Sequence, residues 1–92
     1  MNLDRLVAMV NDISAFFAGE SGPDAPAAVA DHLRRFWEPR MRAEIVAAYR
    51  DNPGALKNLS EIGRNAIGQL HDAIQLLLLY PWHDFEQSHD TT

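Results

Sequence analysis

The chain contains no cysteine. Disulfides, thiol nucleophiles and cysteine-ligated iron–sulfur clusters are therefore excluded as chemistry of this chain. Its fold has to rest on packing alone, and a chain of 92 residues buries only about 60 to 65 % of the surface that it exposes when unfolded. We expect one domain of marginal stability.

Positive charge is scarce, because eight Lys and Arg residues face 13 Asp and Glu residues and leave a formal charge of -5. Nucleic acids and anionic membranes are bound through clustered basic residues, so we expect neither as the main partner. Apolar runs that approach the about 18 residues of a membrane helix are also missing. The first residues are amphipathic and lack the basic-then-apolar order of a signal peptide, which favours a cytoplasmic protein.

Motifs for catalysis or metal binding are missing as well. The four histidines, at positions 32, 71, 83 and 89, include no i, i+4 pair and no HExxH motif. The polar residues around His83 and His89 are typical of a solvated tail, and the serines lack a recognisable nucleophile context. We therefore predict no catalytic residue, no metal site and no enzyme activity of the chain alone.

Apolar residues at helical spacing begin at Leu3 and predict a first helix over residues 3–18, with Asn2 as its N-cap and Gly19 as its stop. The inner stripe of this helix comprises Leu3, Leu6, Val7, Val10, Ile13 and Phe17. Met9 and Phe16 lie to one side of it. They are either flanking core residues or the edge of a docking surface.

A second helix is predicted from about Asp24 to Trp37, and a third begins at Pro39 and ends at the Asn52-Pro53-Gly54 turn. Pro39 disfavours helical geometry at the residue before it and predicts a tight bend between the two helices. We expect the second helix to bury Val29, Ala30, Leu33, Phe36 and Trp37, and the third to bury Met41, Ile45, Ala48 and Tyr49.

The fourth predicted helix spans residues 56–80, with Gly63 in its inner stripe as a point of close helix approach. Gly68 lies on the opposite side, where the sequence offers no packing explanation for it. The stripe itself comprises Leu59, Ala66, Leu70, Ala73, Ile74 and Leu77. Four consecutive leucines cannot all face one core. The outward residues Leu76 and Leu79, followed by Trp82 and Phe85, form either an apolar docking patch or a surface covered by the tail.

These elements predict an all-α fold of four helices, with one helical domain over residues 1–80 and a polar, aromatic tail over residues 81–92. The segment from His32 to Arg42, HLRRFWEPRMR, reverses the charge of the chain, because it holds four of the eight basic residues. Phe36, Trp37, Pro39 and Met41 are predicted to hold the bend together.

The basic residues of this segment have two interpretations. Asp31 with Arg35 and Glu38 with Arg42 have the i, i+4 spacing of solvated helix-surface pairs. Alternatively, arginine forks bind carboxylates or phosphates in a bidentate manner. The candidates for contact with a partner or with a cofactor phosphate are His32, Arg34, Arg35, Arg40 and Arg42.

The LVxMVNxIxxFF pattern of the first helix and the AxHLRRFWxPRMR pattern that ends at Arg42 give the chain a family resemblance. Over roughly residues 3–75 it resembles the delta subunit of cytoplasmic, NAD-dependent, molybdenum-containing formate dehydrogenases. In that family a large molybdopterin subunit oxidises formate, and smaller flavin and iron–sulfur subunits pass the electrons to NAD. The resemblance implies a complex that carries molybdopterin guanine dinucleotide, iron–sulfur clusters, FMN and NAD, and a delta subunit without a redox centre.

The first hypothesis is therefore a non-catalytic accessory subunit that binds the catalytic (alpha) subunit and supports assembly or stability of the complex. A transient chaperone for insertion of the molybdenum cofactor is the second hypothesis, and a free-standing homodimeric helical module is the third. The sequence leaves open whether the partner is permanent and whether the arginines contact protein or cofactor. It also leaves open the oligomeric state of the isolated chain and the role of the tail.

Overall fold

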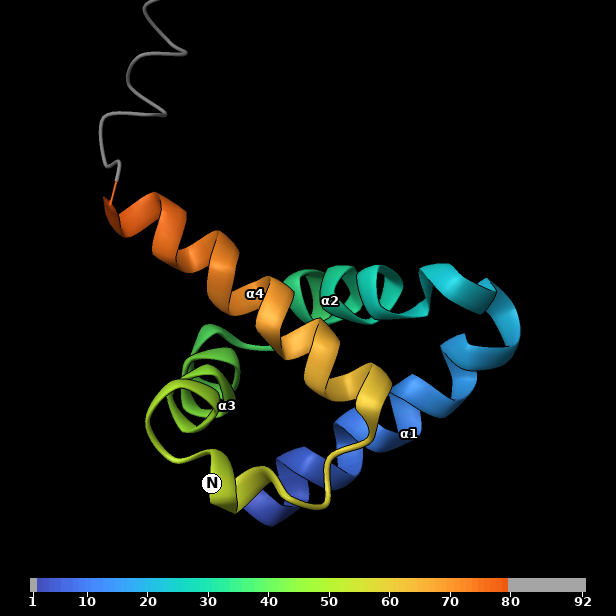
Figure 1. Ribbon diagram of the computed structural model, residues 1–92, viewed down its shortest axis with the longest axis horizontal. Helices are drawn as coiled ribbons and strands as arrows, with labels where there is room; N and C mark the ends of the chain where they lie inside the picture. Colours follow the sequence, from blue (N-terminus) through green and yellow to red (C-terminus); the bar gives the residue numbers. More distant parts are fainter. Residues whose placement is uncertain (1, 80–92) are drawn as a thin grey trace, which may run out of the picture.

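The computed structural model describes residues 2–79, and all regular structure within them is helical, which confirms the predicted all-α class. Four α-helices and two short 3₁₀ helices follow one another along the chain (Figure 1). They are α1 (Leu3–Ser21), η1 (Gly22–Asp24), α2 (Ala25–Phe36), α3 (Pro39–Asp51), η2 (Pro53–Leu56) and α4 (Glu61–Leu79). Helix α4 packs against α1, α2 and α3, and runs diagonally across the molecule in Figure 1.

Helix α1 begins as predicted and ends later than predicted. Asn2 is its N-cap, and the Asn2 side chain accepts a hydrogen bond of 2.8 Å from the backbone N–H of Asp4. The predicted stop at Gly19 is wrong, since the helix continues to Ser21. The turn that follows α1 is made at Gly22, whose φ of 55° is accessible to glycine at little cost.

The predicted bend at Pro39 is confirmed. Trp37 and Glu38 are extended, with ψ angles of 144° and 148°, and Pro39 is the first residue of α3. This is the geometry expected of a residue before proline and of a proline that opens a helix. Trp37 is buried as predicted, with 6 % of its surface exposed, whereas the prediction that Phe36 belongs to the core is wrong, because 70 % of Phe36 is exposed.

Helix α4 begins five residues later than predicted. Residues up to Leu56 form η2, and the chain then turns until Ser60, whose side chain accepts a 3.0 Å hydrogen bond from the N–H of Gly63. Asn11 of α1 ties this turn to the fold. Its amide donates to the carbonyl of Asn58 at 3.0 Å and its oxygen accepts from the N–H of Ser60 at 2.8 Å.

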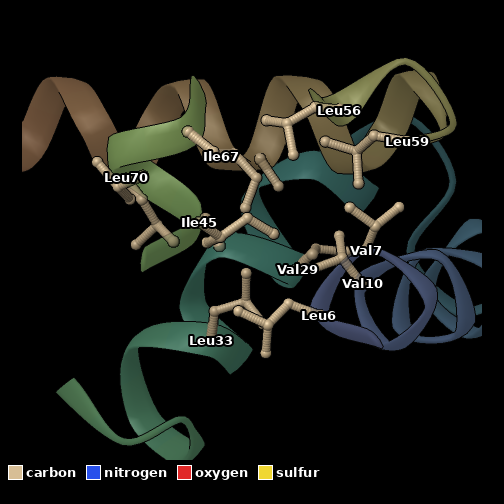
Figure 2. Close-up of a cluster of buried hydrophobic side chains, with 14 of the residues drawn as sticks. Leu6, Val7, Val10, Val29, Leu33, Ile45, Leu56, Leu59, Ile67 and Leu70 are labelled. Carbon is tan, nitrogen blue, oxygen red and sulfur yellow. The ribbon is translucent and has the colours of Figure 1, made fainter. Parts of the chain in front are cut away.

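One hydrophobic core joins all four α-helices and η2 (Figure 2). Its largest completely buried aliphatic side chains are Leu6, Leu33, Ile45, Leu56 and Ile67. The sequence analysis missed Val46 and Ile67 as core residues. It also placed Ala73 and Ile74 in the inner stripe of α4, which is wrong because both are exposed.

The predicted role of Gly63 is confirmed. A Cβ atom at this position would lie 2.8 Å from Cγ1 of Val10 and 3.2 Å from Cδ1 of Leu59, so the missing side chain lets α4 approach α1. The sequence offered no packing explanation for Gly68, and the structure provides one. A Cβ atom there would lie 2.8 Å from the hydroxyl oxygen of Tyr49 on α3.

Candidate partner-binding surface

The segment His32–Arg42 comprises the second half of α2, the bend and the first turn of α3. Arg42 turns back toward the end of α2 and donates from Nη1 to the backbone carbonyls of Leu33 at 3.3 Å, of Arg34 at 3.1 Å and of Trp37. The Leu33 carbonyl also accepts from the N–H of Trp37 at 3.1 Å. The carbonyls at the end of a helix carry its negative dipole end, so a guanidinium group is well suited to them. Arg42 thus stabilises the bend, and its predicted pairing with the Glu38 side chain is replaced by these backbone contacts.

Arg34 and Arg35 share one carboxylate. Nη2 of Arg34 pairs with one oxygen of Asp31, and Nε of Arg35 lies 3.0 Å from the other oxygen, which confirms the predicted pair of Asp31 and Arg35. About two thirds of each arginine side chain is exposed, and exposed pairs of this kind contribute about 0–1 kcal/mol. Both guanidinium groups can therefore exchange Asp31 for a carboxylate of a partner at little cost.

The other predicted contact residues differ in their surroundings. Arg40 is exposed on the first turn of α3. His32 is half-buried and stacks against Phe36, with 4.8 Å between the ring centroids. Arg34 faces α4 and lines a hollow of about 280 Å³ with Gln69 and Leu70, among other residues. The segment therefore presents its arginines on more than one side of α2.

Four aromatic rings form a continuous row across α1 and α2, and this feature was only partly anticipated. Phe16 contacts Phe17 edge to face at 5.1 Å, Phe17 contacts His32 at 5.9 Å, and His32 contacts Phe36. We name Phe16, Phe17, His32 and Phe36 the aromatic row. Its two ends are exposed, by 61 % for Phe16 and 70 % for Phe36.

The sequence signal for the row was the position of Phe16 beside the inner stripe. Of the two interpretations given for Met9 and Phe16, flanking core describes Met9, which packs against the core, and the edge of a surface describes Phe16. A pocket of about 280 Å³ opens beside the row and is lined by Asp12, Ile13, Phe16, Phe17 and His32.

Two further predictions concern Met41 at the bend and the apolar docking patch near the end of the chain. Met41 is half-buried and packs against the core, which suits its predicted role at the bend. The predicted apolar docking patch at Leu76, Leu79, Trp82 and Phe85 lies outside the residues whose side chains the structure describes, so it stays a prediction.

Arg50 and Asp51 at the end of α3 form the ion pair with the clearest electrostatic effect. The Arg50 guanidinium donates to the Asp51 carboxylate from Nε at 3.0 Å and from Nη2 at 2.8 Å. These hydrogen bonds favour the charged carboxylate and hold the pKa of Asp51 below its ordinary value, while the pKa of Arg50 is raised. Both groups are solvent-exposed, so this pair contributes little to the stability of the fold.

Within residues 2–79, no three His, Asp or Glu side chains are grouped so that they could hold a metal ion. No helix in the same part of the chain is both long enough and apolar enough to cross a membrane. The fold and this surface define the class of the molecule as a small all-α protein that displays exposed aromatic and arginine side chains around a helix–helix bend.

The family follows from comparison with known proteins. The chain matches the model of the family described as NADH-dependent formate dehydrogenase delta subunit FdsD over residues 5–67, which include α1 from Arg5 onward, the bend and the first turns of α4. The match covers 63 of the 92 residues, and the chain belongs to this family. No curated protein and no solved structure matches the chain.

Proposed function

We propose that the chain is a non-catalytic accessory subunit that binds the molybdenum-containing catalytic subunit of a cytoplasmic formate dehydrogenase and supports assembly and stability of the complex. The observation that carries this proposal is the family match, which includes the entire basic segment from His32 to Arg42. The molybdopterin guanine dinucleotide, iron–sulfur clusters, FMN and NAD of such a complex belong to the other subunits in this proposal.

The arrangement of the arginines supports a role in protein contact. The whole chain has a formal charge of -5. The segment 31–42, which includes Arg35 and Arg40, has four arginines and two acidic residues and therefore a local charge of +2. A basic site on an acidic protein favours encounter with an acidic partner surface and penalises other orientations. Arg34, Arg35 and Arg40, together with His32, are the proposed contact residues. Arg42 also supports the bend, and its contact with a partner stays a prediction.

The test is coexpression of a tagged chain with the formate dehydrogenase subunits of the same organism. We expect the wild-type chain to copurify with active enzyme in a fixed stoichiometry, and its omission to lower the yield of assembled complex. A variant with Arg34, Arg35 and Arg40 changed to Ala should copurify poorly while keeping its helical circular dichroism. Arg42 stays unchanged in this variant because its loss would disturb the bend.

Two results would contradict the proposal. If the wild-type chain fails to associate with the catalytic subunit, the accessory role is wrong. If the chain is missing from active enzyme, but its omission leaves the catalytic subunit without molybdenum, the chain is a transient maturation factor instead.

A further inference from the structure

The aromatic row brings two exposed aromatic side chains, Phe16 and Phe36, into one connected group. Phe16, Phe36 and Ile74 are the large hydrophobic residues that are exposed among the described side chains, and Phe16 and Phe36 end the same row. Isolated exposed apolar side chains are ordinary on protein surfaces, whereas contiguous groups mark interaction sites. Aromatic side chains, Phe among them, are also enriched in the core of protein interfaces.

The shape beside the row suits the insertion of a side chain. The 280 Å³ pocket lies between α1 and α2, and the rings of Phe16, Phe17 and His32 form most of its wall together with Ile13. Figure 1 shows that α1 is joined to α2 through η1, and the residues that line the pocket come from these two consecutive helices. A side chain entering the pocket would meet aromatic faces and edges and one carboxylate, that of Asp12.

The positive charge of Arg35 beside the aromatic row favours a partner that carries a carboxylate. Arg35 follows His32 by three residues on α2, so the two side chains are neighbours on the helix surface. Its guanidinium group is exposed and lies 3.0 Å from the Asp31 carboxylate. A carboxylate of a partner could replace Asp31 there, because the existing pair contributes little in water.

We propose that the aromatic row is the docking site for an amphipathic segment of the catalytic subunit, which inserts an aliphatic or aromatic side chain into the pocket beside Phe16 and places a carboxylate against Arg35. The proposal rests on the proposed function and specifies the surface and the partner chemistry. In this arrangement the aromatic row supplies the desolvated centre of the contact, and Arg35 fixes its orientation from the rim.

The experiment compares binding of matched full-length variants to the purified catalytic subunit, with circular dichroism as the check on folding. The double variant Phe16→Ala with Phe36→Ala should raise the Kd at least about tenfold, as expected for two aromatic anchors. The control is Ile74→Ala, which removes an exposed apolar side chain from α4 and should change the Kd less than about threefold.

Charge is tested by Arg35→Glu against Arg50→Glu. Both arginines are exposed and paired with an acidic residue of their own helix, at 3.0 Å for Arg35 and at 2.8 Å for Arg50. Arg35→Glu should weaken binding at least about tenfold at low salt, with a smaller difference at high salt, whereas Arg50→Glu should bind like the wild type.

The failures of the two proposals are distinguishable. If the wild-type chain does not bind the catalytic subunit, the proposed function fails. If the wild type binds and the double phenylalanine variant binds equally well, the accessory role stands and the row is not the docking site. A larger loss for Ile74→Ala than for the double variant would place the contact on α4 and overturn the proposal.

The double phenylalanine variant also distinguishes two other possible occupants of the aromatic row. A concentration-dependent dimer of the isolated chain that the double phenylalanine variant abolishes, with partner binding unaffected, would assign the row to a second copy. A shift of the Trp82 indole signal in the NMR spectrum of that variant, again with partner binding intact, would assign the row to residues 80–92. Either result would overturn the proposal.

Discussion

At the scale of single residues, Arg42 is the arginine with the most internal contacts. It donates to three carbonyls at the end of α2, and hydrogen bonds from a charged donor contribute about 1.5–3 kcal/mol when partly buried. We expect Arg42→Ala to lower the free energy of unfolding by about 1–3 kcal/mol. Arg42→Lys should lower it by less, because Lys keeps the positive charge although it lacks the planar guanidinium donors. The control Arg40→Ala removes an exposed side chain two residues away and should change stability by less than about 0.5 kcal/mol. Urea unfolding measures all three, and equal losses for Arg40→Ala and Arg42→Ala would contradict the assignment.

Phe36 and Trp37 show what helical periodicity can and cannot predict for single residues. Both follow Leu33 at spacings of three and four, so a continuing helix would bring both toward the same face. The helix ends between them, however, and Trp37 adopts extended backbone angles that carry its ring into the core. Phe36, the last helical residue, is directed along the His32 edge of α2 instead. The exact helix end decides this outcome, and sequence patterns place helix ends only within a few residues.

At the scale of the elements, two glycines of α4 allow a matched test of packing. A methyl group at Gly63 would press on the buried side chains of Val10 and Leu59. At Gly68 it would meet the hydroxyl end of the half-buried Tyr49 side chain. Each Gly→Ala change gains about 1 kcal/mol of helix propensity, and overpacking a core costs about 1–3 kcal/mol. We therefore expect Gly63→Ala to lower stability by up to about 2 kcal/mol and Gly68→Ala to leave it unchanged or to raise it by up to about 1 kcal/mol. Thermal melts of the two variants check this, and a larger loss for Gly68→Ala would show that Tyr49 is held as rigidly as Val10.

The order of helices and the bend could be predicted because they depend on local signals, namely apolar spacing, Asn2 as a cap and Pro39 as a break. The start of α4 could not be predicted from apolar spacing alone, because Leu56 and Leu59 continue its stripe although they lie in η2 and the following turn. Ser60 followed by Glu61 was the available local signal for an N-cap and an acidic first turn. The aromatic row depends on the packing of α1 against α2, and a tertiary contact between Phe17 and His32 has no signature in local spacing.

At the scale of the whole molecule, the single core makes the four α-helices interdependent. Leu6, Leu33, Ile45 and Ile67 come from four different helices and belong to one buried cluster, so none of these helices has a core of its own. Small domains of this kind usually unfold in one cooperative transition. We therefore expect the loss of helical circular dichroism to coincide with the change in Trp37 fluorescence, measured in a Trp82→Phe background where Trp37 is the only tryptophan.

The conservative changes Ile45→Val in α3 and Ile67→Val in α4 extend this prediction to each side of the core. Each should lower the free energy of unfolding by about 0.5–1.5 kcal/mol and the Tm by about 4–8 °C per kcal/mol. Because both side chains are completely buried in the same cluster, each change should shift the circular dichroism and fluorescence curves together. If Ile67→Val shifted only the circular dichroism curve, α4 would unfold separately from the α2–α3 bend around Trp37. In that case the surface around the bend could persist without α4, and the proposed docking site would not depend on the whole fold.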